Sequence, residues 1–137
     1  MENNTDQKFT KGLHHLGLTV PDVAITAAFF VDQLGFMIVG EKPDYPAIFV
    51  SDGTIMLTLW QAQCETPNPF DRKNVVGLHH FALKVESKAK LDELYQTFST
   101  LPEIAVEFAP EALGGSGAVH MMCTIPGGLR VEFIVTP

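Results

Sequence analysis

One short segment occurs twice in the chain, and this repeat limits the possible folds more than any other feature. Residues 12–20 read GLHHLGLTV, and residues 77–85 read GLHHFALKV. Each copy is followed by a residue that suits the N-cap of a helix, Asp22 in the first copy and Ser87 in the second. An internal repeat at this spacing predicts two similar supersecondary units.

The segments after the two copies follow the same order of predicted elements. Apolar residues at helical spacing predict one helix in each half, the first ending near Gly35. Three segments rich in β-branched and aromatic residues follow each helix, and a longer loop at 109–117 interrupts the second set. The predicted strands are residues 36–41, 47–50, 54–61, 104–109, 118–125 and 128–135. We therefore expect an α+β fold of two tandem βαβββ modules that form a cleft or partial barrel.

The expected organisation is one structural domain, since 137 residues suffice for a single buried core. Residues 1–11 are predicted to be a polar N-terminal extension, and 12–62 the first module. Residues 63–76 contain two prolines and show no periodicity, which indicates a linker. The second module is predicted to span 77–137.

The composition favours a small-molecule partner. The formal net charge is −7, and no basic run is present to neutralise nucleic-acid phosphates. The start MENNTDQKF lacks the features of a secretory signal, and no apolar run approaches bilayer length, so we expect a cytoplasmic protein without a membrane partner. Cys64 and Cys123 lack CxxC spacing and are expected to be reduced and structural.

The two-residue period of a strand separates the histidines of each doublet. His14 shares its strand face with apolar residues, whereas His15 shares the other face with a glycine and a threonine. His79 and His80 divide in the same way. The apolar face is expected to lie under a helix, so His15 and His80 are predicted to point into the cleft.

Glu132 lies in the apolar last strand and would be costly to bury without a cation. Two imidazoles and one carboxylate on converging strands are typical ligands of a divalent first-row metal, which keeps open positions for substrate. The sequence therefore favours a metal site of His15, His80 and Glu132. The alternative is that each histidine hydrogen-bonds within a core and that Glu132 pairs with Arg130 or Lys84.

The chain resembles the vicinal oxygen chelate superfamily, which includes glyoxalase I, extradiol dioxygenases, fosfomycin-resistance thiol transferases, methylmalonyl-CoA epimerase and bleomycin-binding proteins. The matching segments are HLGLTVPDV, AFFVDQLGF, HFALKV and PGGLRVEFIV. The resemblance implies a metal cleft between paired βαβββ modules and a homodimer. It matches His15 and His80 to the histidine ligands of the two modules, and Glu132 to the carboxylate of the closing strand.

One position departs from part of this family. In glyoxalase I and the epimerase, the last strand of the first module supplies a further ligand, and Thr58 occupies that position here. The resemblance thus implies a site of two histidines and one glutamate, as in extradiol dioxygenases and fosfomycin transferases. A strict lactoylglutathione lyase assignment is weakened, while many extradiol enzymes have four modules where this chain has two.

Other residues have two possible roles each. His120 is either a general acid or base, because imidazole titrates near neutral pH, or a structural strand histidine. Trp60 lines the cleft or packs in the core, and Arg130 binds a substrate anion or forms a structural ion pair. Together with Thr58 and Met122, these two residues form the predicted substrate-binding set.

The predicted function is that of a metal-dependent glyoxalase- or dioxygenase-like enzyme. A divalent metal, with Fe, Mn, Zn, Ni and Co as alternatives, would polarise oxygens of a small substrate. Lyase, dioxygenase and transferase activities are alternatives that the residues leave open. The alternative from another class is a metal-free protein that sequesters a small molecule, as bleomycin-binding relatives do.

Overall fold

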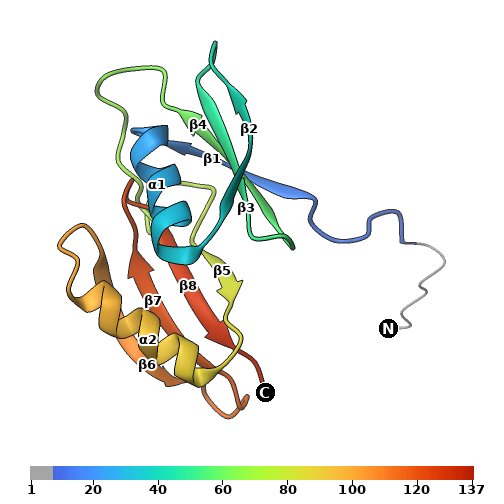
Figure 1. Ribbon diagram of the computed structural model, residues 1–137, viewed down its shortest axis with the longest axis vertical. Coiled ribbons are helices and arrows are strands. Elements are labelled where there is room, and N and C mark those ends of the chain that lie inside the picture. The colour runs from blue at the N-terminus through green and yellow to red at the C-terminus, as the bar shows by residue number, and fades with distance from the viewer. Residues whose placement is uncertain (1–7) are drawn as a thin grey trace.

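The computed structural model describes residues 8–137, which form two four-stranded sheets, each with one helix (Figure 1). The first module contains β1 (His15–Val20), α1 (Val23–Leu34), β2 (Met37–Lys42), β3 (Ala47–Ser51) and β4 (Met56–Gln61). The second contains β5 (Phe81–Lys84), α2 (Lys88–Ser99), β6 (Ala105–Ala112), β7 (Val119–Thr124) and β8 (Arg130–Val135). The predicted α+β class and the βαβββ order of both modules are confirmed.

The strand order is β1-β4-β3-β2 in the first sheet and β5-β8-β7-β6 in the second. In each sheet the first strand runs parallel to the last, so the repeated histidine segment lies beside the closing strand of its own module. The register places Gly17 opposite Thr58, and Ala82 opposite Glu132. The first and last strands of each module, which carry or adjoin the candidate residues, therefore lie side by side in one sheet.

Both predicted N-caps are confirmed. The Asp22 carboxylate accepts hydrogen bonds from the backbone N–H groups of Ala24 and Ile25 at 3.0 and 3.1 Å. The Ser87 hydroxyl oxygen accepts one from Lys90 N–H at 3.2 Å. Each cap satisfies backbone donors that the first turn of a helix leaves without a partner, and so determines where the helix begins.

The loop predicted at 109–117 is partly wrong, because β6 continues through Ala112. Glu111 and Ala112 pair with His120 and Val119 of β7, after register shifts that leave β6 irregular. Pro110 lies inside this strand, where it would interrupt a central ladder. It is tolerated because β6 is at the edge of its sheet.

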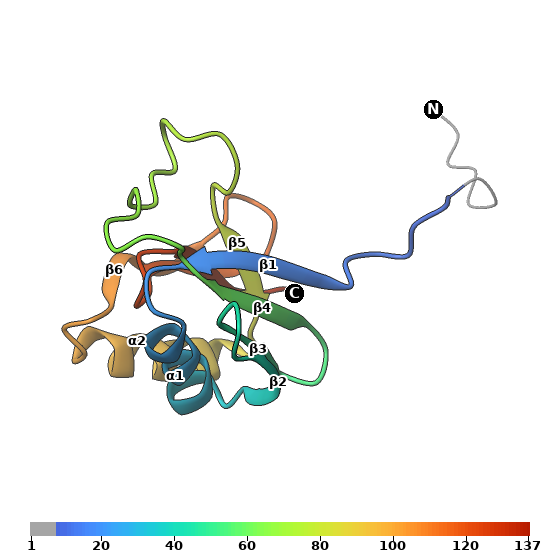
Figure 2. The same ribbon diagram turned by 90° about the horizontal axis from the view of Figure 1, so that it is seen from above.

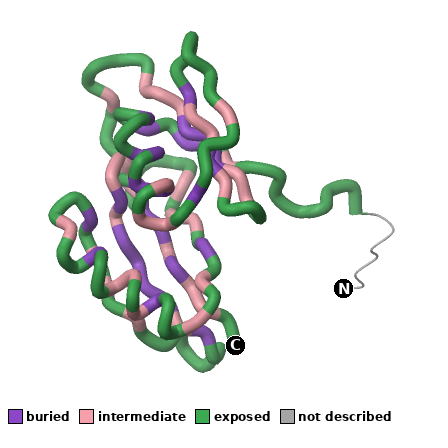
Figure 3. The backbone as a smooth tube through the Cα atoms, in the orientation of Figure 1, coloured by how far each residue is buried: buried purple, intermediate pink, exposed green. Residues whose placement is uncertain are grey.

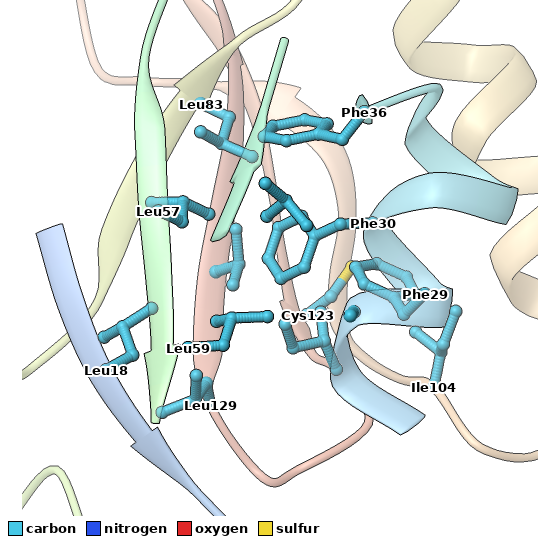
Figure 4. Packing of buried hydrophobic residues seen from close by; sticks show 14 of the residues in the cluster. Leu18, Phe29, Phe30, Phe36, Leu57, Leu59, Leu83, Ile104, Cys123 and Leu129 are labelled. Carbon is cyan, nitrogen blue, oxygen red and sulfur yellow. The ribbon is translucent and has the colours of Figure 1, made fainter. Parts of the chain in front are cut away.

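A single hydrophobic core extends across both modules, where the helices cover the sheets (Figures 3 and 4). Phe30 and Phe98 have no exposed surface, and the rings of Phe29 and Phe98 lie 5.8 Å apart between α1 and α2. Figure 4 shows Phe30 facing Leu57 and Leu59 of β4. Burial of these rings joins the two repeats into one packed unit.

Both helices lie on the same side of the two sheets (Figure 2). The other face of each sheet, here called the open face, is left without a helix. The hydroxyl of Thr26 in α1 donates a hydrogen bond to the carbonyl of Pro126 at 3.1 Å, which connects the modules on the helix side. Across residues 8–137, neither helix is long and apolar enough to span a membrane.

Candidate metal centre

His80 and Glu132 come together on the open face of the second sheet. His80 directly precedes β5, and Glu132 lies in the neighbouring β8. Nε2 of His80 is 3.7 Å from Oε1 of Glu132, and the glutamate side chain is only 12% exposed. Two donors bound to one metal at about 2.0–2.2 Å lie roughly 3–4 Å apart. This pair therefore fits two coordination positions of a single ion.

His120 holds the other oxygen of the same carboxylate. Its Nδ1 lies 2.6 Å from Oε2 of Glu132. An ionised carboxylate only accepts hydrogen bonds, so the imidazole is the donor through Nδ1. His120 is buried in β7, and its ring packs 4.9 Å from that of Phe108. Glu132 is thus oriented by His120 on one side and faces His80 on the other, while an acid–base role for His120 stays a prediction.

His15 belongs to the other sheet. It begins β1, is exposed, and has its Nδ1 at 2.8 Å from Nδ1 of His14. Among residues 8–137 of one chain, no three His, Cys, Asp or Glu side chains are grouped so that they could hold a metal. A single chain therefore brings His80 and Glu132 together and leaves His15 apart from them.

Arg130 has a partner that the sequence did not suggest. Its Nε and Nη2 donate to the two carboxylate oxygens of Glu107 in β6 at 3.0 and 2.6 Å. This hydrogen bonding lowers the pKa of Glu107 and raises the pKa of Arg130. Nη1 of Arg130 also lies 3.4 Å from Nδ1 of His79, and desolvation together with the Arg130 charge lowers the pKa of His79.

On the open face of the first sheet, Thr58 is buried and its hydroxyl is engaged. Trp60 Nε1 donates to Thr58 Oγ1 at 2.9 Å. The ring centroids of Tyr45 and Phe49 lie 4.7 and 5.6 Å from that of Trp60. The indole is therefore part of a three-ring cluster, and the sequence did not indicate its other two members. Phe49 pairs with Thr58 across β3 and β4, a register that strand patterns alone do not reveal.

Met122, Lys84 and Cys123 lie in three different environments. Met122 is buried in β7 opposite Glu132, so it lies beside the candidate metal ligands. Lys84, offered as an alternative partner of Glu132, instead lines a cavity of about 470 Å³ between α1, α2 and β5, which also includes Phe36 and Leu83. Cys123 lies in the core, where burial raises the pKa of its thiol to about 12 and keeps it protonated.

Known proteins resemble this chain in sequence and in structure. Catechol-2,3-dioxygenase of Bacillus subtilis (strain 168) is 34% identical over 82 residues, which are 57% of this chain and 28% of that protein. The chain thus spans only about a quarter of that relative's length. Lactoylglutathione lyase from Agrobacterium tumefaciens is 27% identical, with a TM-score of 0.70 over 93% of this chain and 96% of that one.

A glyoxylase/bleomycin resistance protein/dioxygenase domain from Frankia sp. EAN1pec has a TM-score of 0.81 at 19% identity, covering 93% of this chain and 99% of that domain. At this identity the likeness concerns the fold. Residues 12–133 match the family described as the Glyoxalase/Bleomycin resistance protein/Dioxygenase superfamily. Because that match covers most of the chain, the predicted resemblance is confirmed and the protein belongs to this superfamily.

Proposed function

We propose that this protein is a metal-dependent, glyoxalase- or dioxygenase-like enzyme in which a divalent metal polarises oxygens of a small substrate. The observation that carries the proposal is the 3.7 Å separation of His80 Nε2 and Glu132 Oε1 on the open face of the second sheet. Imidazole and carboxylate donors suit Fe, Mn, Co, Ni and Zn alike. The lyase and dioxygenase among the proteins of similar sequence or structure favour an enzyme over a sequestering protein.

The third ligand in this proposal is His15 of a second copy of the chain. His15 is exposed, and it lies in a different sheet from Glu132. Both open faces point away from the helices, so they are available to a second copy (Figure 2). In a two-fold dimer, each first module would meet the second module of its partner, and the same contact would occur twice. The homodimer would then carry two equivalent metal sites.

The bound metal would supply a Lewis acid that stabilises negative charge developing on a substrate oxygen. The chain's own residues would prepare the site for it. His120 holds Glu132 in one orientation through the 2.6 Å hydrogen bond, so the carboxylate is preorganised. The rings of Tyr45, Phe49 and Trp60 would form an apolar wall that excludes water from the substrate.

Metal content tests the proposal directly. Protein saturated with a divalent metal and then desalted should retain close to one metal ion per chain by elemental analysis. His15→Ala, His80→Ala and Glu132→Ala should each lose it, because each removes a ligand. Glu41→Ala, which removes an exposed carboxylate from β2, is the matched control and should retain the metal. Wild-type protein that binds no metal would instead support the sequestering alternative.

A mixing experiment tests whether the site spans two copies. His15→Ala and Glu132→Ala chains are each expected to bind no metal alone. A mixed dimer would contain one site with both intact ligands and one site with both replaced. Random exchange of subunits should therefore restore roughly one quarter of the wild-type metal content. A mixture that recovers no metal, under conditions where subunit exchange is demonstrated, would contradict a shared site.

A further inference from the structure

We propose that Arg130 is a positioning residue that determines the tautomer of His80 through His79, so that His80 presents an unprotonated Nε2. The inference rests on the proposed metal function of His80 and concerns the residues behind that ligand. It also gives a physical reason for the second histidine doublet, in which His79 is not itself a metal ligand.

The contact between Arg130 and His79 has only one possible direction of hydrogen bonding. A guanidinium group has only donors, and the Glu107 carboxylate holds Nε and Nη2 of Arg130 at 3.0 and 2.6 Å. This bidentate contact fixes the plane of the guanidinium. Its Nη1 lies 3.4 Å from Nδ1 of His79, so Nδ1 of His79 is the acceptor.

The direction of the Arg130 contact also decides which of the two histidines donates to the other. Nδ1 of His79 lies 2.7 Å from Nδ1 of His80, a distance at which one nitrogen must donate and the other must accept. The Arg130 N–H group directed at Nδ1 of His79 disfavours a proton on that nitrogen, so its single lone pair faces both donors, the nearer His80 and the more distant Arg130. The proton in the contact between the two histidines therefore lies on Nδ1 of His80. A neutral imidazole carries one ring proton, which leaves Nε2 of His80 with a free lone pair.

The unprotonated nitrogen of His80 faces the candidate metal position. Nε2 of His80 is the atom that lies 3.7 Å from Oε1 of Glu132. A proton on Nε2 would occupy the position where a metal must bind and would point at the carboxylate. Arg130 and His79 therefore favour the tautomer that can ligate. Partners of this kind, which fix the second ring nitrogen of a ligating histidine, are common around metal sites.

The histidine doublet of the first module, His14 and His15, can be compared with that of the second. Nδ1 of His14 and Nδ1 of His15 lie 2.8 Å apart, in the same arrangement. Within residues 8–137 of one chain, no arginine hydrogen bond to either ring accompanies this contact. Within one chain, the tautomer of His15 is therefore not determined by an arginine, unlike that of His80.

Long-range proton–nitrogen correlation NMR of metal-free protein tests the assignment without measuring activity. At mildly alkaline pH, where imidazoles are neutral, wild-type His80 should be a single tautomer protonated at Nδ1. Arg130→Met should convert it to a mixture. Arg72→Met is the matched control, because Arg72 also contacts Glu107, at 3.4 Å, and should leave His80 unchanged.

Wild-type protein with the proton on Nε2 of His80 would overturn the inference, as would identical His80 spectra for the two arginine variants. Should Arg130→Met not fold, Glu107→Gln, which loosens the guanidinium while keeping it, provides the same comparison.

Titration with Co²⁺ provides the second readout. Arg130→Met should bind about 10- to 100-fold more weakly than Arg72→Met, the range found when a partner of a ligating histidine is lost. Equal affinities would contradict the positioning role. Wild-type protein that binds no Co²⁺ yet shows the expected tautomer would contradict the proposed function while supporting the assignment of Arg130.

Discussion

Glu132 accepts a hydrogen bond from Nδ1 of His120 at 2.6 Å through one oxygen, while its other oxygen lies 3.7 Å from Nε2 of His80. One carboxylate thus connects a buried histidine of β7 to the histidine that precedes β5. His120 contacts Glu132 and not the proposed metal position. It would therefore affect metal binding by orienting Glu132, without binding the metal itself.

Replacement of His120 by phenylalanine should weaken metal binding by about 10- to 100-fold, because Glu132 loses the donor that orients it. Calorimetric titration with Zn²⁺ measures the affinity. Met122→Leu alters a buried neighbour of Glu132 on the adjacent strand and keeps the hydrogen bond, so it serves as the control. Equal affinities for the His120→Phe and Met122→Leu proteins would contradict an orienting role for His120.

The ion pair between Arg130 and Glu107 should make stability depend on acid pH. The hydrogen bond from Arg130 holds the pKa of Glu107 below its ordinary value of 4.5, so the pair contributes fully above pH 4.5. This contribution is lost as pH falls through the lower, folded-state pKa. At neutral pH, Glu107→Gln should lower the free energy of unfolding by about 1 kcal/mol, since Glu107 is partly exposed.

Urea unfolding of the wild-type and Glu107→Gln proteins from neutral to acid pH measures this effect. The difference between the two should shrink below pH 4.5. Glu103→Gln, which changes an exposed carboxylate before β6, should show no comparable trend. A difference that stays constant down to the acid limit would show that Glu107 does not titrate through this pair.

The hydrogen bond from Trp60 to Thr58 should report on the open face of the first sheet. Trp60 is the one tryptophan of the chain, so its fluorescence is a specific probe. Thr58→Val removes the acceptor at 2.9 Å, and should lower the free energy of unfolding by about 1 kcal/mol and shift the emission maximum. The exposed Thr54→Val should change neither property by a comparable amount. An unshifted spectrum would count against this contact.

Two adjacent glycines should respond differently to alanine, because only one approaches the other module. Gly127 and Gly128 have φ angles of 103° and 88°, so either substitution strains the backbone by about 1–2 kcal/mol. A Cβ at Gly127 would lie 2.7 Å from Oγ1 of Thr26, which is fully buried, whereas a Cβ at Gly128 has nothing within 4 Å.

Gly127→Ala should therefore cost about 1–3 kcal/mol more than Gly128→Ala in urea unfolding, since the junction between the modules is overpacked. Equal losses for the two variants would mean that Thr26 moves aside freely and that this contact does not hold the modules together.

Local patterns in the sequence predicted much of the fold. The repeated segments predicted the modules, Asp22 and Ser87 marked the helix starts, and the two-residue period placed His80 on the face that carries Glu132. These features depend on neighbours within a few residues, so a single sequence contains them. The extension of β6 through Ala112 was missed, because tolerance of Pro110 depends on that strand being at an edge.

Only the tertiary structure showed which side chains contact one another. Glu107 pairs with Arg130, and His120 pairs with Glu132, because the register of β6, β7 and β8 brings together residues that are distant in the sequence. His15 shares the local pattern of His80 but lies in a separate sheet, away from Glu132. The sequence by itself determined which residue types face the open side of each sheet. Only the pairing of strands decided which of them meet, because a shift of one residue in register changes every partner.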